Sequence, residues 1–170
     1  MSIEIYGWDE LLPEDKELIA SSVESFTNGN TGEKPQMLPV TKQGVYNKFL
    51  AAVALSEGEF MGYVAADTPL RYNETTMVEI GSLWVPSQQR KRGIARSLVS
   101  YLTLAVEQED ITPFAFCNQS SIDVFLGSGY NRAMPEDIPP VAYGLCSECP
   151  LKPDTGCCDT TVIYCRDNDE

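Results

Sequence analysis

The chain of 170 residues contains 12 Lys or Arg, 25 Asp or Glu and no His, which gives a net charge of -13 at pH 7. The length suits one folded domain, and so acidic a chain argues against a nucleic-acid partner, because binding a polyanion requires a broad basic face. The lack of His excludes Ser-His and Cys-His catalytic pairs and every metal site with a His ligand.

No run of about 18 or more apolar residues is present, so we expect no membrane span. The N-terminal residues MSIEIYGWDELLPEDKE contain neither the basic segment nor the apolar segment of a secretory signal. We therefore expect a cytoplasmic protein in which the six cysteines are reduced.

Two helices are predicted early in the chain. Residues 12–26 form the first, and its initial turn contains Pro13 and two acidic residues that interact favourably with the helix dipole. Residues 27–39 are rich in Gly, Asn and Pro and predict a loop. A short second helix is expected over residues 41–50.

Strands follow, and then helices and strands alternate. Residues 51–67 predict two strands joined by a tight turn at Glu57-Gly58, and residues 75–85 predict a third strand. The later predictions are a helix over 93–108, a buried strand over 112–117, a helix within 118–130 that stops at Gly127 to Gly129, and a last strand over 159–165. This alternation indicates an α/β (α+β) architecture on one sheet.

A basic window lies between the strand that ends near Val85 and the helix that begins near Gly93. Its four cations are Arg90, Lys91, Arg92 and Arg96. A helix N-terminus has unpaired N–H groups and a positive dipole end, and Gly93 and Ala95 allow a ligand to approach the backbone. The window matches neither the dinucleotide-binding glycine motif nor the P-loop. A solvated basic helix start is the alternative, but the strand-loop-helix context favours a site for a small anion.

Two motifs identify a family. The segment VPSQQRKRGIA (residues 85–95) resembles the coenzyme A signature of the GNAT superfamily of N-acetyltransferases, R/Q-x-x-G-x-G/A after a V-x-P strand end. The segment NQSSIDVFLGSGY (residues 118–130) resembles the second GNAT motif, N-x-x-[AS]-x-x-x-[YF]-x-x-x-G-[FY]. The resemblance implies a single acyltransferase domain over residues 1–170. Its sheet is expected to be mixed, mostly antiparallel and twisted, with roughly six or seven strands and about four flanking helices.

The resemblance also implies acetyl-coenzyme A as the co-substrate. Backbone N–H groups from Lys91 to Arg96 would hold the pyrophosphate, main-chain groups of Leu83 and Val85 would bind the pantetheine amides, and Asn118 would hydrogen-bond the pantetheine arm. The full set of residues expected at this site is Leu83, Trp84, Val85, Arg90, Lys91, Arg92, Gly93, Ile94, Ala95, Arg96, Asn118, Ser121 and Phe125.

The chemistry implied is direct transfer of the acetyl group to an amine, which must lose a proton. Glu79, on the central strand two residues before Gly81, is the candidate general base; a strand residue paired with a cation is the alternative. Phe125 occupies the position that often holds a Tyr acid, and it cannot donate a proton. A thiolate with a pKa near ~8.5 leaves with little help, and Tyr130 or Tyr143 is a less favoured substitute acid.

The acceptor is read from weaker signals. The tail between residues 146 and 165 loosely resembles N-acetylglutamate synthase-like members, which favours a small amino acid or a similar amine. The cations that could bind an α-carboxylate are Arg132, Arg71, Lys42 and Lys48. The acidic composition instead suits a polyamine, a Lys side chain, a protein N-terminus or an aminoglycoside. The loop 27–39 is expected to border the acceptor site.

The role of the cysteines in the tail stays open. The four tail cysteines that zinc would need are Cys146, Cys149, Cys157 and Cys158. The adjacent pair fits a zinc knuckle poorly, so reduced structural thiols are favoured over zinc, and a disulfide or redox pair is the third option. Cys117 is expected in the core.

A non-catalytic coenzyme A-binding or protein-interaction module is the alternative function, and a homodimer through late strands is a family expectation.

Overall fold

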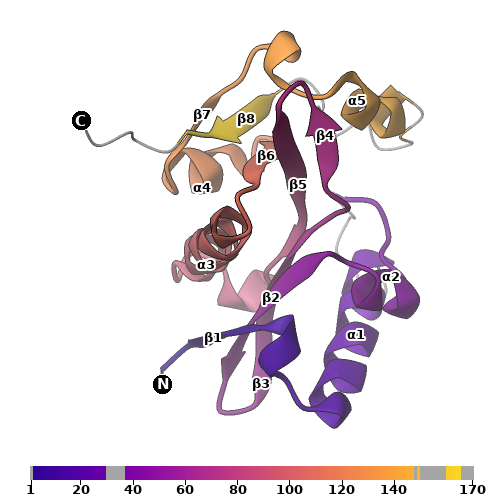
Figure 1. Ribbon diagram of the computed structural model, residues 1–170. Coiled ribbons are helices and arrows are strands. Elements are labelled where there is room, and N and C mark those ends of the chain that lie inside the picture. Colours follow the sequence, from indigo (N-terminus) through magenta and orange to yellow (C-terminus); the bar gives the residue numbers. More distant parts are fainter. Residues whose placement is uncertain (1, 30–36, 148, 150–159, 166–170) are drawn as a thin grey trace.

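The structure is a computed structural model, and it describes residues 2–29, 37–147, 149 and 160–165. One twisted eight-stranded sheet runs through it in the order β1-β2-β3-β5-β6-β8-β7, with β4 paired to β5 (Figure 1). The strands are β1 (Glu4–Gly7), β2 (Leu50–Ser56), β3 (Glu59–Ala66), β4 (Leu70–Tyr72), β5 (Thr75–Trp84), β6 (Thr112–Phe116), β7 (Tyr130–Arg132) and β8 (Thr161–Tyr164). Every pair is antiparallel except β5 with β6.

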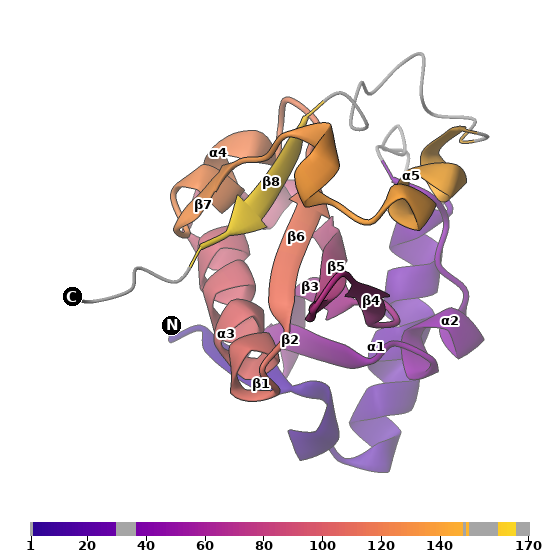
Figure 2. The same cartoon turned by 45° about the horizontal axis from the view of Figure 1, so that its top comes forward.

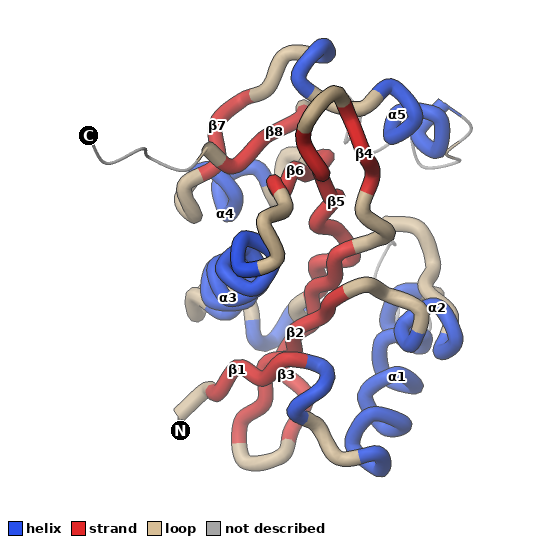
Figure 3. Tube along the Cα trace, in the orientation of Figure 1, coloured by secondary structure: helices blue, strands red, loops and turns tan. Residues whose placement is uncertain are grey.

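Helices cover both faces of this sheet. They are α1 (Pro13–Thr27), α2 (Lys42–Tyr46), α3 (Ile94–Gln108), α4 (Ile122–Leu126) and α5 (Pro140–Ser147). Figure 3 shows α1 and α2 on one side of the strands and α3 on the other. None of the helices in the described ranges is both long and apolar enough to cross a bilayer.

The core follows the alternation of side chains along β3. Val64 and Ala66 are buried in the cluster that contains Leu98 of α3, whereas Tyr63 and Ala65 are buried in the cluster that contains residues of α1. Successive side chains of a strand point to opposite faces, so each face of β3 is covered by its own helices.

The sequence predicts the long elements well and the short ones poorly. The helix over 12–26, the strand hairpin, the central strand and the helix over 93–108 are confirmed. The hairpin turn has left-handed backbone at both Glu57 (φ 51°) and Gly58 (φ 81°), as a type I′ turn requires. The sheet has eight strands rather than six or seven, because β1, β4 and β7 span only three or four residues each and leave no readable periodicity.

Two predicted helices are shorter than expected, and α5 was missed. The helix predicted over 118–130 is reduced to α4, because residues 118–121 form a hydrogen-bonded turn before it. The helix predicted over 41–50 ends at Tyr46, and β2 already begins at Leu50. Most of the predicted loop 27–39 and the cysteines Cys157 and Cys158 lie outside the described residues.

The middle of the sheet opens at the carboxyl end of β5. On its β3 side, Gly81 pairs with Ala65 and Trp84 pairs with Tyr63, so β5 has one more residue than β3 between these pairs. The resulting bulge places Ser82 in left-handed backbone, with a φ of 53°. On the other side, the parallel pairing of β5 with β6 covers only Met77–Glu79 of β5, whereas β6 stays paired with β8 as far as Phe116. Figure 2 shows β7 and β8 beside the upper end of β6, with α4 next to them.

The first turn of α3 lies close to β3 at Gly62, and this approach yields a test of stability. A Cβ on buried Gly62 would stand 3.0 Å from Leu98 Cδ1, 3.1 Å from the Trp84 carbonyl and 3.2 Å from Ile94 Cγ2. We expect Gly62→Ala to lower the free energy of unfolding by about 1–3 kcal/mol through overpacking, measured by urea denaturation.

Gly144→Ala is the matched control. Gly144 is exposed in α5, and no described atom lies within 4 Å of the Cβ that would be added. Alanine there is expected to preserve stability or to raise it by up to about 1 kcal/mol, because Ala favours helix. Equal effects of the two changes would show that α3 and β3 do not approach closely at Gly62.

Candidate functional site

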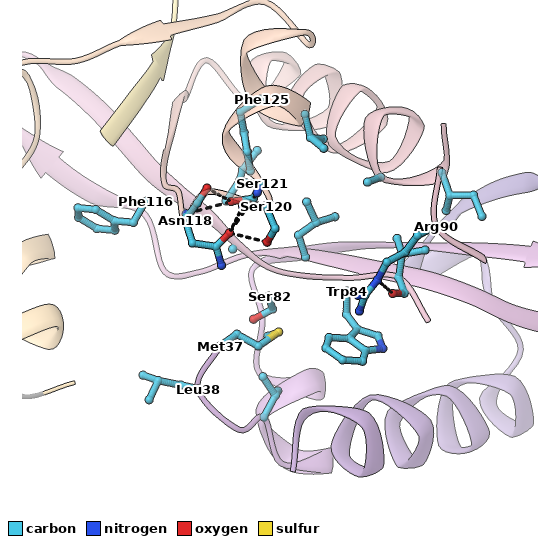
Figure 4. A pocket seen from close by; sticks show the side chains of 18 of the residues that line it. Met37, Leu38, Ser82, Trp84, Arg90, Phe116, Asn118, Ser120, Ser121 and Phe125 are labelled. Carbon is cyan, nitrogen blue, oxygen red and sulfur yellow. Dashed lines mark hydrogen bonds between the residues drawn. The ribbon is translucent and has the colours of Figure 1, made fainter. Parts of the chain in front are cut away.

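A cavity of about 1290 Å³ lies at the opening of the sheet. Its walls come from residues 37–41 before α2, the second half of β5, the first turn of α3, the end of β6 and the segment that leads into α4. Figure 4 shows Ser82 in the middle of this region, with Asn118 on one side and Met37 on the other. The bulge of β5 therefore lies on the cavity wall.

One end of the cavity is built to hold an anion. The first N–H to carbonyl bond of α3 runs from Ser97 to Gly93 at 3.0 Å, so the N–H groups of Ile94, Ala95 and Arg96 precede the helical pattern. Gly93 caps the helix with left-handed backbone (φ 80°, ψ 0°) and has no side chain to accept from these groups. Three N–H donors and the positive end of the helix dipole are consequently directed out of the helix.

Cations surround this helix start. The Arg90 Nε donates to the Val85 carbonyl at 2.9 Å, and the Arg90 guanidinium carbon lies 5.5 Å from the centre of the Trp84 ring, as Figure 4 shows. Arg96 lies against Gly127 at the end of α4, where an added Cβ would overlap its guanidinium. Arg90, Lys91 and Arg96 line the cavity, whereas Arg92 does not and instead hydrogen-bonds the Gln89 side chain.

The bulge in β5 leaves main chain beside the cavity. Ser82 and Leu83 lie between the residues that pair with β3, and the pairing with β6 has already ended at Glu79. Both residues line the cavity. Backbone groups at such an unpaired strand segment are available to an extended ligand that adds as a further strand.

Asn118 organises the turn before α4. Its side-chain oxygen accepts hydrogen bonds from the backbone N–H groups of Ser120 and Ser121, both at 3.0 Å, and from the Ser120 hydroxyl at 2.7 Å. The Asn118 N–H in turn donates to the Ser121 hydroxyl at 3.1 Å. Figure 4 shows the amide nitrogen of Asn118 directed towards the side of the cavity where Ser82 lies. The oxygen therefore holds the turn, and the amide nitrogen faces the cavity.

Glu79 lies at the other end, beside a second carboxylate. The Asp67 N–H donates to the Glu79 carbonyl at 3.0 Å, which places the two residues opposite each other on neighbouring segments of the sheet. Lys48 Nζ lies 2.5 Å from Asp67 Oδ1, and all three residues line the cavity. Burial, aided by the negative charge of Asp67, raises the pKa of Glu79 to about 7, although Lys48 acts in the opposite direction. Glu79 thus exchanges its proton near neutral pH, which suits a general base.

No tyrosine among the described residues lines the cavity. The Tyr130 hydroxyl lies 2.7 Å from the Thr103 hydroxyl, and its ring contacts the buried Phe125 with 5.1 Å between centroids. Burial raises the pKa of Tyr130. The Tyr143 hydroxyl lies 3.4 Å from that of Thr161. Neither substitute acid considered from the sequence is in contact with the cavity.

The expected site residues are brought together, and the structure adds others. Except for Arg92, all the residues expected to bind coenzyme A line this one cavity, and so does Glu79. Among the additions are Asp67 and Phe116, whereas Met37, Leu38 and Pro39 are the described end of the loop that was expected to border the acceptor site. The position of Asp67 at the end of a predicted strand is a usable signal, but only the register of the sheet places it beside Glu79.

The cysteines do not form a metal site within the described ranges. Cys117 is buried in the core, as expected. Cys149 lines the cavity, whereas Cys157, Cys158 and the Cys146 side chain lie outside what the structure describes. No group of three or more Cys, Asp or Glu side chains in the described part of the chain is arranged to hold a metal ion.

Solved structures share this fold at low sequence identity. N-acetylglutamate synthase from Neisseria gonorrhoeae, complexed with coenzyme A and N-acetyl-glutamate, matches with a TM-score of 0.69 and 14% identity over 96% of this chain and 35% of its own. This chain therefore spans about a third of that synthase. An acetyltransferase of the GNAT family from Staphylococcus aureus Mu50 matches with a TM-score of 0.62 and 12% identity over 96% of this chain and 98% of its own. A predicted acetyltransferase from Clostridium acetobutylicum, with acetyl-CoA, matches with a TM-score of 0.59 and 11% identity over 79% and 93%.

Among curated proteins, no sequence matches this chain. The family model of the acetyltransferase (GNAT) family, however, matches residues 17–130. That range contains the bulged strand β5, the N-terminus of α3 and the Asn118 turn. The chain belongs to the acetyltransferase (GNAT) family.

Proposed function

We propose that this protein transfers the acetyl group of acetyl-coenzyme A to the primary amine of a small molecule. One observation carries the proposal: the helix start that suits a phosphate and the carboxyl group that titrates near neutral pH line the same cavity. Solved GNAT relatives that contain coenzyme A or acetyl-CoA share the fold, which supports the choice of donor.

The residues fit this donor from end to end. The exposed N–H groups of Ile94, Ala95 and Arg96 would bind the pyrophosphate, and Arg90 and Lys91 would add positive charge. The unpaired backbone of Ser82 and Leu83 would pair with the pantetheine amides, opposite the amide nitrogen of Asn118. The thioester would then lie near Gly81 and Glu79, between the bulge and the acidic end of the cavity.

Each atom of the transfer has a destination. The neutral amine nitrogen forms a bond with the thioester carbon, the carbon–sulfur bond breaks, and the sulfur departs as the thiolate. Glu79 accepts the proton that the amine nitrogen loses, directly or through water. A thiolate whose conjugate thiol has a pKa near ~8.5 can depart without a general acid to protonate it. This is consistent with the absence of tyrosine from the described cavity wall.

Gly93→Asp tests the anion end. The new carboxylate would stand beside the helix start and repel phosphate, so we expect the dissociation constant of acetyl-coenzyme A to rise roughly tenfold or more, measured by calorimetry. Gly58→Asp is the matched control, since Gly58 has the same left-handed φ (81° against 80°) and is likewise free of described atoms within 4 Å of an added Cβ. Equal affinities of both variants and the parent would remove the helix start from the donor site.

Glu79→Gln tests the base. Its amide cannot accept the proton, so we expect turnover to fall about 10²-fold or more, while the affinity for acetyl-coenzyme A stays within about twofold. The rise of turnover with pH near 7 should disappear in the variant. Glu74→Gln, an exposed carboxylate between β4 and β5, provides the control. A parent-like pH profile in Glu79→Gln would exclude Glu79 from the mechanism.

The same substitution has an effect on stability that needs no substrate. The pKa of Glu79 is about 7 in the folded state against 4.5 for the free group, so between these values the folded state holds a proton that the unfolded state loses. The parent therefore loses stability as pH rises from 4.5 to 7, and the Gln variant lacks this loss. The melting temperature of the variant relative to that of the parent should therefore be higher at pH 8 than at pH 5. A pH-independent difference would contradict the raised pKa of Glu79.

A further inference from the structure

The cations that line the cavity are divided unevenly. Within the described residues they are Arg90, Lys91, Arg96 and Lys48. The first three surround the start of α3, where the phosphates of the donor would bind. Lys48 alone lies at the Glu79 end, and its ammonium group is paired with Asp67 at 2.5 Å.

The other cations considered for an α-carboxylate lie elsewhere. Arg71 and Arg132 are exposed on β4 and β7 and do not line the cavity. Lys42 does not line it either, and its side chain pairs with Glu17. Among the described residues, an α-carboxylate at the Glu79 end would therefore meet two carboxylates and one cation that already has a partner. Withdrawing Lys48 from Asp67 would leave one carboxylate without a counter-ion, which is unfavourable in a partly buried site.

Apolar side chains form much of the remaining described wall of the cavity. Met37, Leu38, Pro39 and Val40 form one wall, and Phe116 contributes an aromatic ring. Figure 4 shows Leu38 and Phe116 at the side of the cavity away from Arg90, and Met37 beside Ser82. An uncharged, apolar body fits against these side chains, because its burial is favourable and it requires no hydrogen-bond partner.

We propose that the acceptor is a primary amine on an apolar, uncharged body without an α-carboxylate, and that Asp67 determines this specificity. The proposal rests on the proposed function and narrows it: simple alkyl and arylalkyl amines are substrates, whereas amino acids are poor ones. The carboxylates of Asp67 and Glu79 outnumber Lys48, the one described cation beside them, so this end attracts the incoming ammonium group and repels a carboxylate. The ammonium group releases its first proton to solvent, and Glu79 accepts the second proton during transfer. The preferred amine carries one positive charge, since the described part of the apolar wall offers no carboxylate to a second ammonium group.

Matched acceptors test the charge directly. Thiol release from acetyl-coenzyme A would be followed with phenethylamine against L-phenylalanine, and with pentylamine against L-norleucine, pairs that differ only by the carboxylate. We expect kcat/KM to be at least about tenfold higher for each amine. L-Phenylalaninamide, which is as bulky as phenylalanine but lacks the negative charge, should approach phenethylamine. Putrescine, which carries a second ammonium group, should be poorer than pentylamine.

Two variants test the role of Asp67. Asp67→Asn should narrow the ratio of kcat/KM between phenethylamine and phenylalanine at least about threefold, mainly through KM, because it removes the repulsion and releases Lys48. Lys48→Gln should widen the same ratio, since it leaves Asp67 unpaired. Asp110→Asn, at an exposed turn after α3, is the matched control and should leave the ratio unchanged.

The outcomes separate the two proposals. Equal or better use of the amino acids, an amide as poor as phenylalanine, or ratios unmoved in both variants would overturn the specificity while leaving acetyl transfer in place. Thiol release with none of these acceptors, despite calorimetric binding of acetyl-coenzyme A, would overturn acetyl transfer to small amines as well.

Discussion

The interrupted pairing of β5 is the constraint on which the rest of the site depends. A strand in the middle of a sheet normally has all of its backbone groups paired with its neighbours, and no ligand can reach them. Here the bulge at Ser82 interrupts the pairing of β5 with β3, and the pairing with β6 ends at Glu79. Two results follow from one distortion. Main chain is released beside a large cavity, and the side chain of Glu79 stays at the edge of the paired region, where it is partly buried.

Charge is distributed so that the two ends of this cavity do opposite tasks. Most of the chain is acidic, yet three of the cations that line the cavity stand at the start of α3, where the helix dipole adds to them. At the other end, burial and a neighbouring carboxylate keep the proton affinity of Glu79 high. A carboxylate placed among the cations would instead be ionised at neutral pH and would be a poor proton acceptor. The separation of Glu79 from the cations at the start of α3 therefore helps to keep its pKa high enough for it to accept a proton.

The sequence predicts the donor half far better than the acceptor half. Motif residues such as Gly93, Ala95 and Asn118 belong to two short, contiguous motifs. Each acts through its own backbone or through its neighbours, so a linear pattern is enough to find them. Asp67 and Lys48 act through partners that are distant in sequence, and only strand register brings them to Glu79. Phe125 is predicted only in part. The motif gives its position, but its packing against Tyr130, whose hydroxyl lies beside that of Thr103, is evident only from the three-dimensional structure.

The fixed orientation of the Arg90 side chain has a further consequence for the entropy of binding. A long basic side chain on a protein surface normally loses much of its rotational freedom when it grips an anion, at a cost of about 0.5–1.5 kcal/mol. Arg90 is already fixed before any ligand arrives, by its bond to the Val85 carbonyl and by the ring of Trp84 beneath it. Trp84 in turn stacks on Phe26 of α1, with 6.0 Å between ring centres. The orientation of one surface cation is therefore maintained through Trp84 by a helix on the far side of the central strand.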